Sequence, residues 1–212
     1  MSPCGFLRLL SSVHGPVSWW SDDPYQVIVE AVLVQNTAWE NVLAVRRSLS
    51  GKLSPGWLSG LSDEELHEAI RPCGFQKAKG ACLRSLTAWF LENEDRVRSL
   101  ETEQIRDELM LIRGVGRETA DVILLYAFRR PVFVTDAYSR RILGRFGFSF
   151  SSDDMIRDYF EGSLGTQELG SLHWLILETG RTWCRKSPRC HQCPLASSCA
   201  TGTATQPNTR LG

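Results

Sequence analysis

The chain has 212 residues and is 42% hydrophobic, which is enough for one sizeable core or two small ones. Its 24 basic and 24 acidic residues cancel, so the net charge indicates no particular class of partner. No apolar run reaches the roughly 18 residues of a membrane span, and residues 1–10 lack the features of a signal peptide. We therefore expect an intracellular, cytoplasmic protein without a membrane partner.

Helical spacing dominates the chain, because apolar positions recur three and four residues apart and strand signals are nearly absent. The pattern predicts an all-α fold. A long helical stretch is expected at residues 25–49, broken near Gln35, Asn36 and Thr37. Further helices are expected at 62–70, 77–93, 102–111, 117–128, 136–146, 152–160 and 169–181, and residues 200–212 should be a disordered tail.

A glycine hairpin, "LIRGVG" at residues 111–116, joins two of the predicted helices. Its glycines would let a phosphate approach the backbone N–H groups at the start of the next helix. Seven arginines against three acids lie between residues 113 and 145, although charge alone would more often mark a solvated basic face. Together these features indicate sequence-independent contact with a nucleic-acid backbone through Arg113, Gly114, Val115, Gly116 and Arg117.

A lone acid, Asp136, follows "FVT" and precedes the helical pattern "AYSRRILGRFG". The simpler interpretation is a helix N-cap, a position that aspartate favours. The functional interpretation is a carboxylate that stabilises a positively charged sugar as its base departs, and that orients or deprotonates the attacking water.

Four of the seven cysteines form the pattern C-x5-C-x2-C-x5-C near the end of the chain. In an intracellular protein, thiols this close indicate a metal centre rather than disulfides. A four-cysteine zinc site usually has two close pairs, whereas this pattern has one, so a [4Fe–4S] cluster is the first choice, zinc the second and free thiols the third. The predicted ligands are Cys184, Cys190, Cys193 and Cys199.

The hairpin, the aspartate eighteen residues after Glu118 and the four-cysteine terminus together resemble the helix-hairpin-helix DNA glycosylases of the endonuclease III family. The stretch "VEAVLVQNTAWENV" looks like the family's helix whose glutamine, here Gln35, fills the gap left by a flipped base. "RPCGFQKAKG" looks like the family's glycine–aromatic turn and lysine-bearing helix, which implies DNA contacts for Lys77 and Lys79. The resemblance covers residues 25–199.

The resemblance implies two helical domains and a substrate pocket between them. Residues 24–130 would form a central domain with the helix-hairpin-helix at about 104–128, and residues 1–23 with 131–199 would form a second domain with the cluster. It also implies a monomer that binds double-stranded DNA containing a damaged base and flips that base out of the stack.

The chain departs from endonuclease III at two places. Its first cysteine gap is five residues instead of six. Glu118 also stands where endonuclease III carries its catalytic lysine, and no lysine lies between Lys79 and Lys186. Because a carboxylate forms no Schiff base, we expect a monofunctional glycosylase without efficient lyase activity. Alternatively, Glu118 is only a first-turn acid favoured by the helix dipole.

"GRETADVILLYA" and "QNTAWENV" most resemble the endonuclease-III-like 3-methyladenine glycosylases. By that resemblance Trp39 stacks on the flipped base, Trp19 and Trp20 line the pocket, and Gln35 and Glu118 lie beside it. A cationic methylated adenine suits an electron-rich indole, whereas core packing is the usual role of a tryptophan.

Two other functions remain open. A uracil or thymine mismatch glycosylase of the same family would need hydrogen-bond partners for a pyrimidine, and Gln26, Glu30 or Asn36 could provide them. A non-catalytic iron–sulfur DNA-binding protein would keep the hairpin but would have no need of Asp136 beyond its helix cap.

Overall fold

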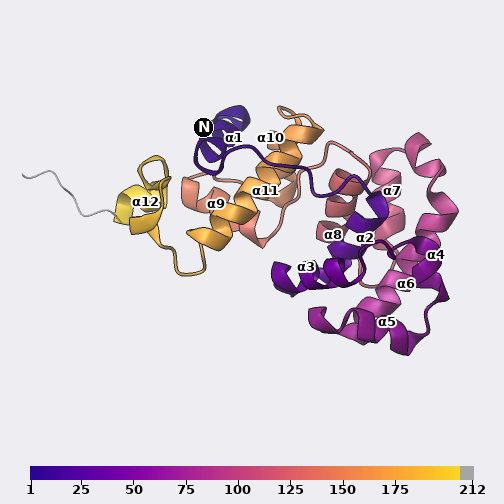
Figure 1. Cartoon of the computed structure of the whole chain (residues 1–212). Helices are drawn as coiled ribbons and strands as arrows, with labels where there is room; N and C mark the ends of the chain where they lie inside the picture. The colour runs from indigo at the N-terminus through magenta and orange to yellow at the C-terminus, as the bar shows by residue number, and fades with distance from the viewer. Residues whose placement is uncertain (206–212) are drawn as a thin grey trace, which may run out of the picture. The chain divides into compact units, whose positions relative to one another are not determined.

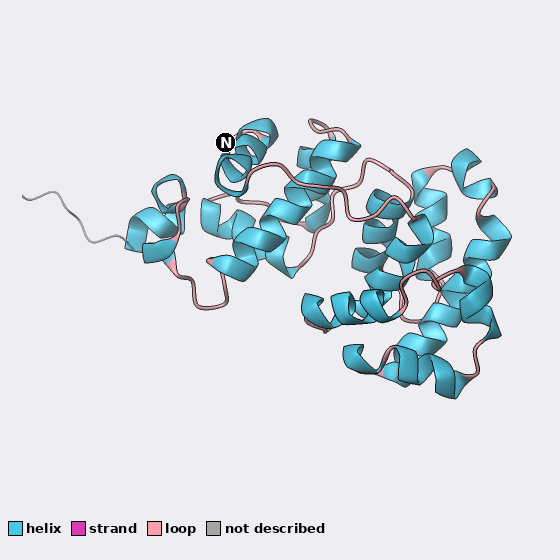
Figure 2. Ribbon diagram, viewed as in Figure 1, coloured by secondary structure: helices cyan, strands magenta, loops and turns pink. Residues whose placement is uncertain are grey.

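The chain folds into two compact helical units, which are described here from a computed structural model for residues 1–205 (Figure 1). One unit contains Met1–Trp19 and the chain from Pro131 onward, and the other contains Trp20–Arg130. Within residues 1–205 every regular element is a helix and none is a strand (Figure 2). The predicted all-α class is therefore confirmed. None of the described helices is long and apolar enough to cross a membrane.

The first unit is built from both ends of the chain. Helix α1 packs along α11, and α9 lies against α11 as well. Phe6 is fully buried, with its ring edge-on to Phe146 and Phe148 at centroid distances of 5.0 and 5.2 Å. The elements are α1 (Pro3–His14), α9 (Ala137–Phe146), α10 (Asp153–Glu161), α11 (Thr166–Thr182), η4 (Cys190–Gln192), η5 (Ala196–Ser198) and α12 (Ala200–Thr205).

The second unit is organised around α2, which packs against α6 and η3. Eight of its ten residues are buried, because its sequence is apolar on nearly every side. The elements are α2 (Pro24–Leu33), α3 (Trp39–Ser48), α4 (Pro55–Gly60), α5 (Asp63–Ala69), η1 (Arg71–Cys73), α6 (Gln76–Asn93), η2 (Arg96–Ser99), α7 (Thr102–Met110), α8 (Arg117–Val122) and η3 (Ile123–Ala127).

Several helix boundaries follow from local chemistry. The break expected near Gln35 is confirmed, because α2 ends at Leu33, α3 begins at Trp39, and Asn36 between them has a left-handed φ of 50°. The helix expected from residue 62 begins with a capping box in which Ser62 and Glu65 exchange side-chain hydrogen bonds with each other's backbone N–H.

Two expectations were wrong. The helix expected at 117–128 changes after Val122 into a π-helical turn, η3, and such turns recur at functional sites. The tail expected to be disordered from residue 200 begins with a helix, α12, in which Gly202 packs so closely on Ala196 that a Cβ would lie 2.4 Å from the Ala196 carbonyl oxygen. The rest of that tail, 206–212, lies outside the described residues.

Candidate active site and cysteine centre

The hairpin between α7 and α8 needs glycine at residue 114 for two reasons. Gly114 has a φ of 96°, and a Cβ there would lie 3.2 Å from the side chain of Cys82 on α6. Val115 is buried and its N–H donates to the carbonyl of Ile112 at 2.9 Å. Val115 therefore holds the turn together, since its amide already has an acceptor within the hairpin, and its contact with DNA stays a prediction.

Leu111, Arg113, Gly114 and Gly116 of the hairpin are exposed, as is Arg117 directly after it. Gly116 is the N-cap of α8 and offers no side-chain acceptor to the first-turn amides, which have no acceptor within a helix. Backbone N–H groups and two arginines thus face solvent on one short loop, which is the chemistry of an anion-binding site.

Gln35 ties the α2–α3 loop to this hairpin. Its Nε2 donates to the carbonyl of Gly114 at 3.1 Å and to the Thr119 hydroxyl at 2.9 Å. Glu118 is exposed in the first turn of α8. The structure therefore places Gln35, Glu118 and the hairpin arginines on neighbouring parts of the second unit.

The two lysines predicted to contact DNA have different environments. Lys77 is exposed on α6, as a DNA contact would require. Lys79 is 4% exposed, and its ammonium donates to the carbonyls of Leu33 and Cys73 and to the Thr37 hydroxyl at 2.6–2.9 Å. Burial lowers the pKa of Lys79. In this structure the Lys79 ammonium therefore fastens the loop that carries Gln35, and a DNA contact for Lys79 stays a prediction.

Three aromatic side chains of the second unit form a cluster. The ring of Trp20 lies edge-on to Trp39 at 5.3 Å and to Tyr126 at 5.2 Å between centroids. Trp39 is the first residue of α3, and Tyr126 lies in the π-helical turn. Trp19 belongs to the first unit, where its ring packs so closely on Gly170 of α11 that a Cβ there would come within 2.5 Å.

Next to this cluster, a buried acid forms an ion pair with a half-buried arginine. Glu30 on α2 is 2% exposed, and both of its carboxylate oxygens accept from Arg46 on α3. The indole Nε1 of Trp20 donates to the same carboxylate at 2.6 Å, and Gln26 donates at 3.1 Å. The role of Arg46 was not foreseen, although a lone acid inside the apolar run "VIVEAVLV" was a signal for a buried partner.

Asp136 is both a helix cap and the acid of a buried pair in the first unit. As the N-cap of α9, its Oδ1 accepts from the N–H of Ser139 at 2.6 Å. Its other oxygen, Oδ2, lies 3.7 Å from Nε2 of His173 on α11. Burial pushes the pKa of Asp136 upward, but the neighbouring His173 and the hydrogen bond from the Ser139 amide outweigh burial and lower the pKa overall. His173 was missed, because nothing in the sequence links it to Asp136.

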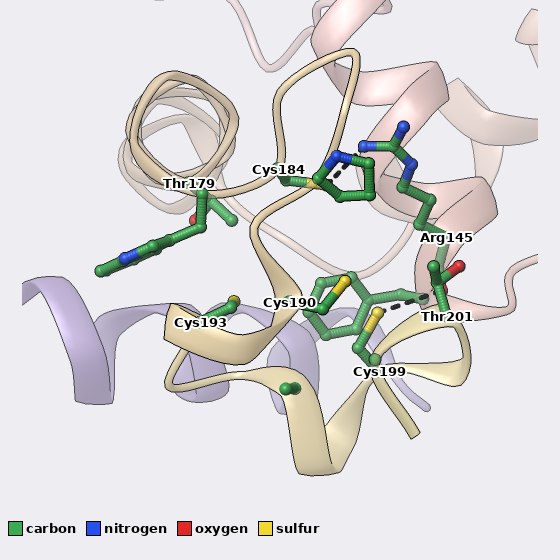
Figure 3. Close-up of a pocket in the computed structure, with 12 residues that line it drawn as sticks. Arg145, Thr179, Cys184, Cys190, Cys193, Cys199 and Thr201 are labelled. Carbon is green, nitrogen blue, oxygen red and sulfur yellow. Dashed lines mark hydrogen bonds between the residues drawn. The ribbon is translucent and has the colours of Figure 1, made fainter. Parts of the chain in front are cut away.

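The four C-terminal cysteines line one pocket in the first unit (Figure 3). All are free thiols, and they follow α11 in a segment with only two short turns, η4 and η5. Among the described residues, no three metal-binding side chains are grouped closely enough to hold one metal ion. A [4Fe–4S] cluster needs a wider set, since each thiolate binds a different iron, and four thiols around one cavity fit that requirement.

Arg145 of α9 holds this segment in place. Its guanidinium donates to Cys184 Sγ at 3.3 Å, and its own carbonyl accepts from Cys199 at 3.1 Å (Figure 3). The guanidinium also donates to the carbonyls of Arg185 and Lys186 at 2.6 and 2.9 Å.

Solved structures with this fold include an endonuclease III trapped as a covalent intermediate on DNA. That protein is 25% identical, with a TM-score of 0.74, and the match covers 96% of this chain and 98% of the other. The 3-methyladenine DNA glycosylase of H. pylori, solved with bound 1,N6-ethenoadenine, has a TM-score of 0.72 at 24% identity and covers 85% of this chain and 98% of its own. The second likeness shows the fold alone.

Three relatives span most of the chain. A Methanocaldococcus jannaschii protein described as a candidate DNA repair glycosylase is 35% identical over 91% of this chain and 93% of its own. The endonuclease III of Sulfolobus acidocaldarius is 29% identical over 82% and 81%, and the thymine/uracil-DNA glycosylase of Pyrobaculum aerophilum is 29% identical over 83% and 79%.

Residues 29–163 match the model of the HhH-GPD superfamily of base excision DNA repair proteins. The match includes the α2–α3 loop, the glycine hairpin and Asp136. The chain therefore belongs to this superfamily and to its endonuclease III-like DNA glycosylases.

Proposed function

We propose that this protein is a monofunctional DNA N-glycosylase that acts as a monomer, flips a damaged base out of the duplex and releases it by hydrolysis. Its preferred substrate is an alkylated purine, 3-methyladenine first. The observation that carries the choice of substrate is the cluster of Trp20, Trp39 and Tyr126. Three electron-rich rings attract a base that carries a positive charge, and the already weakened glycosidic bond of such a base needs little acid catalysis.

Asp136 supplies the carboxylate for hydrolysis in this proposal. Its lowered pKa keeps it ionised at neutral pH, so that it can stabilise the positive charge that develops on the sugar and orient the attacking water. The N-cap bond uses Oδ1. Capping and catalysis are therefore compatible, since a carboxylate has two oxygens.

The absence of lyase activity rests on the lysines. A Schiff base needs an amine that reaches the sugar. Of the four lysines in the sequence, Lys79 is committed to three oxygen acceptors, and the hairpin position of the endonuclease III lysine is taken by Glu118. Release of the base should therefore leave the DNA strand intact.

DNA binding in this proposal uses Arg113, Arg117 and the hairpin amides for the phosphates. Phe75, which was not among the expected contacts, is 67% exposed and has a left-handed φ of 52°. A large apolar side chain held in solvent by an unfavourable backbone is suited to wedge between base pairs. Phe75 would then help to hold the duplex open while the base is out.

The cysteine centre in this proposal holds a [4Fe–4S] cluster bound by Cys184, Cys190, Cys193 and Cys199. When bound, the cluster acts as a covalent staple for the segment after α11, which has little apolar core of its own. Arg145 keeps the segment next to α9. The cluster takes no part in base release, which uses the carboxylate of Asp136.

A uracil or thymine mismatch glycosylase is the second candidate, and the Pyrobaculum aerophilum relative supports it. The geometry is less favourable, because the carboxylate of Glu30 already accepts from Trp20, from Gln26 and from Nε and Nη2 of Arg46. Those four donors match its roughly four lone-pair sites, so Glu30 has no capacity left to read a pyrimidine edge.

The deciding experiment is a panel of duplexes, each with one modified base, scored separately for base release and for strand cleavage. We expect 3-methyladenine to be released faster than uracil from a U·G pair, without strand cleavage. Faster release of uracil would establish the second candidate, and release of no base from any duplex would leave a DNA-binding protein without catalysis.

A further inference from the structure

Arg46 joins the buried carboxylate to the aromatic cluster. Its guanidinium carbon lies 5.5 Å from the ring centroid of Trp39, which is within the range of a cation–π contact. The same guanidinium binds both oxygens of Glu30. One face of the indole that would hold the base is thus next to a permanent positive charge, and that charge is neutralised by one buried acid.

From this arrangement, and resting on the proposed function, we infer that Glu30 sets the charge preference of the base site. An uncompensated guanidinium over Trp39 would repel a cationic base that stacks on the same ring. Paired with Glu30, Arg46 keeps its place over the indole but adds no net charge. Glu30 is thus a specificity-determining residue that acts through Arg46 and does not touch the base.

The carboxylate also positions Trp20. The 2.6 Å bond from the indole Nε1 fixes the ring edge-on to Trp39 and Tyr126. Loss of Glu30 would therefore disturb geometry as well as charge. A purely geometric effect should weaken the binding of cationic and neutral bases alike. A charge effect should change the ratio of the two affinities, so the two effects can be separated.

The test measures a binding ratio. Full-length protein with Asp136→Asn, which should bind without releasing the base, is titrated with two matched duplexes. One contains the cationic base 3-methyladenine, and the other contains the neutral base ethenoadenine. Glu30→Gln keeps the shape of the side chain and removes its charge. It should lower the preference for the cationic base by on the order of tenfold, the effect of one unpaired charge at the effective dielectric of a protein surface.

Removing the positive charge of Arg46 should change the preference for the cationic base in the opposite direction. Arg46→Gln leaves the acid uncompensated and should raise the preference for the cationic base, and the double variant Glu30→Gln with Arg46→Gln should return it near the starting value. Because Arg46→Gln keeps the buried acid in place, the inference is still tested if Glu30→Gln fails to fold.

Trp20→Phe is the geometric control. It removes the indole N–H without changing any charge, so both affinities should fall while their ratio stays constant. The same change of ratio in Trp20→Phe and Glu30→Gln would overturn the inference. A third matched duplex with unmodified adenine tests the proposed function itself: if the Asp136→Asn protein does not prefer 3-methyladenine over adenine, the proposed function fails, and this result is distinct from an unchanged ratio in Glu30→Gln.

Discussion

Oδ2 of Asp136 lies 3.7 Å from Nε2 of His173, and both side chains are almost completely buried. The pair joins the start of α9 to the middle of α11. Because the imidazole favours the ionised carboxylate, the pKa of Asp136 is lowered although burial alone would raise it. The packing of two helices thus controls the charge of the proposed catalytic group.

His173→Gln should therefore move the acidic limb of the pH–rate profile to higher pH. Without the imidazole, burial dominates and Asp136 accepts a proton sooner as the pH falls. The measurement is single-turnover base release between about pH 4 and pH 8. His14→Gln is the matched control, because His14 bonds Thr179 instead. If the acidic limb of the pH–rate profile were unchanged in His173→Gln, the imidazole would have no role in the reaction.

Asp136→Asn should abolish base release while DNA binding stays the same or tightens, since binding rests on backbone amides and arginines. The substitution should also destabilise the fold at neutral pH. A lowered pKa means that the ionised acid stabilises the folded state above its ordinary pKa, and that this stabilisation disappears as the pH falls through the lowered value. The two proteins should therefore become equally stable in strong acid. Full activity of the variant would reduce Asp136 to a helix cap.

The purified protein should be brown and contain about four irons per chain, because four thiols surround one pocket. Cys193→Ser should lose iron and solubility before it loses chemistry in the soluble fraction. Cys4→Ser serves as the control, since Cys4 lies outside the pocket and should not affect the iron content. Colourless protein with stoichiometric zinc would contradict this prediction.

Trp39→Ala should weaken recognition of 3-methyladenine by about 1–3 kcal/mol, the usual contribution of stacking between a base and an aromatic ring. Trp39→Phe should keep much of the binding, because it retains a π-face that attracts cations less strongly. Relative kcat/KM values for base release measure both effects. If Trp39→Ala had no effect on alkylated DNA while uracil was released well, the choice of substrate would be wrong.

Glu118→Lys should not create an efficient lyase. Residue 118 is exposed, so a lysine there would stay protonated and would be a poor nucleophile for the sugar. Borohydride trapping on DNA measures the Schiff base directly. Efficient trapping of the unaltered protein would reveal a nucleophile that its lysine positions do not suggest.

The sequence predicted most of the helices because their signals are local. The capping box at Ser62, the break after Leu33 and the glycine hairpin each depend on residues only a few positions apart. The π-helical turn at Ile123 was missed, since a π turn has the same apolar composition as the α-helix that it interrupts.

The candidate site was less predictable, because its partners are far apart in the sequence. Lys79 has the charge of a DNA contact, but the structure buries it against Leu33 and Thr37. His173 and Asp136, like Arg46 and Glu30, meet only after whole helices have packed. Residue type and spacing suggest which carboxylate is catalytic, whereas the pKa and the partner of that carboxylate depend on tertiary contacts.

The construction of the first unit from both chain ends has a consequence for protein synthesis. Phe6 of α1 packs on Phe146, which is made 140 residues later. At the usual rate of translation, the apolar face of α1 stays uncovered for on the order of ten seconds before Phe146 is made. Residues 20–130 can fold during that interval, so the nascent chain would carry one finished unit and one unburied helix that a chaperone can recognise.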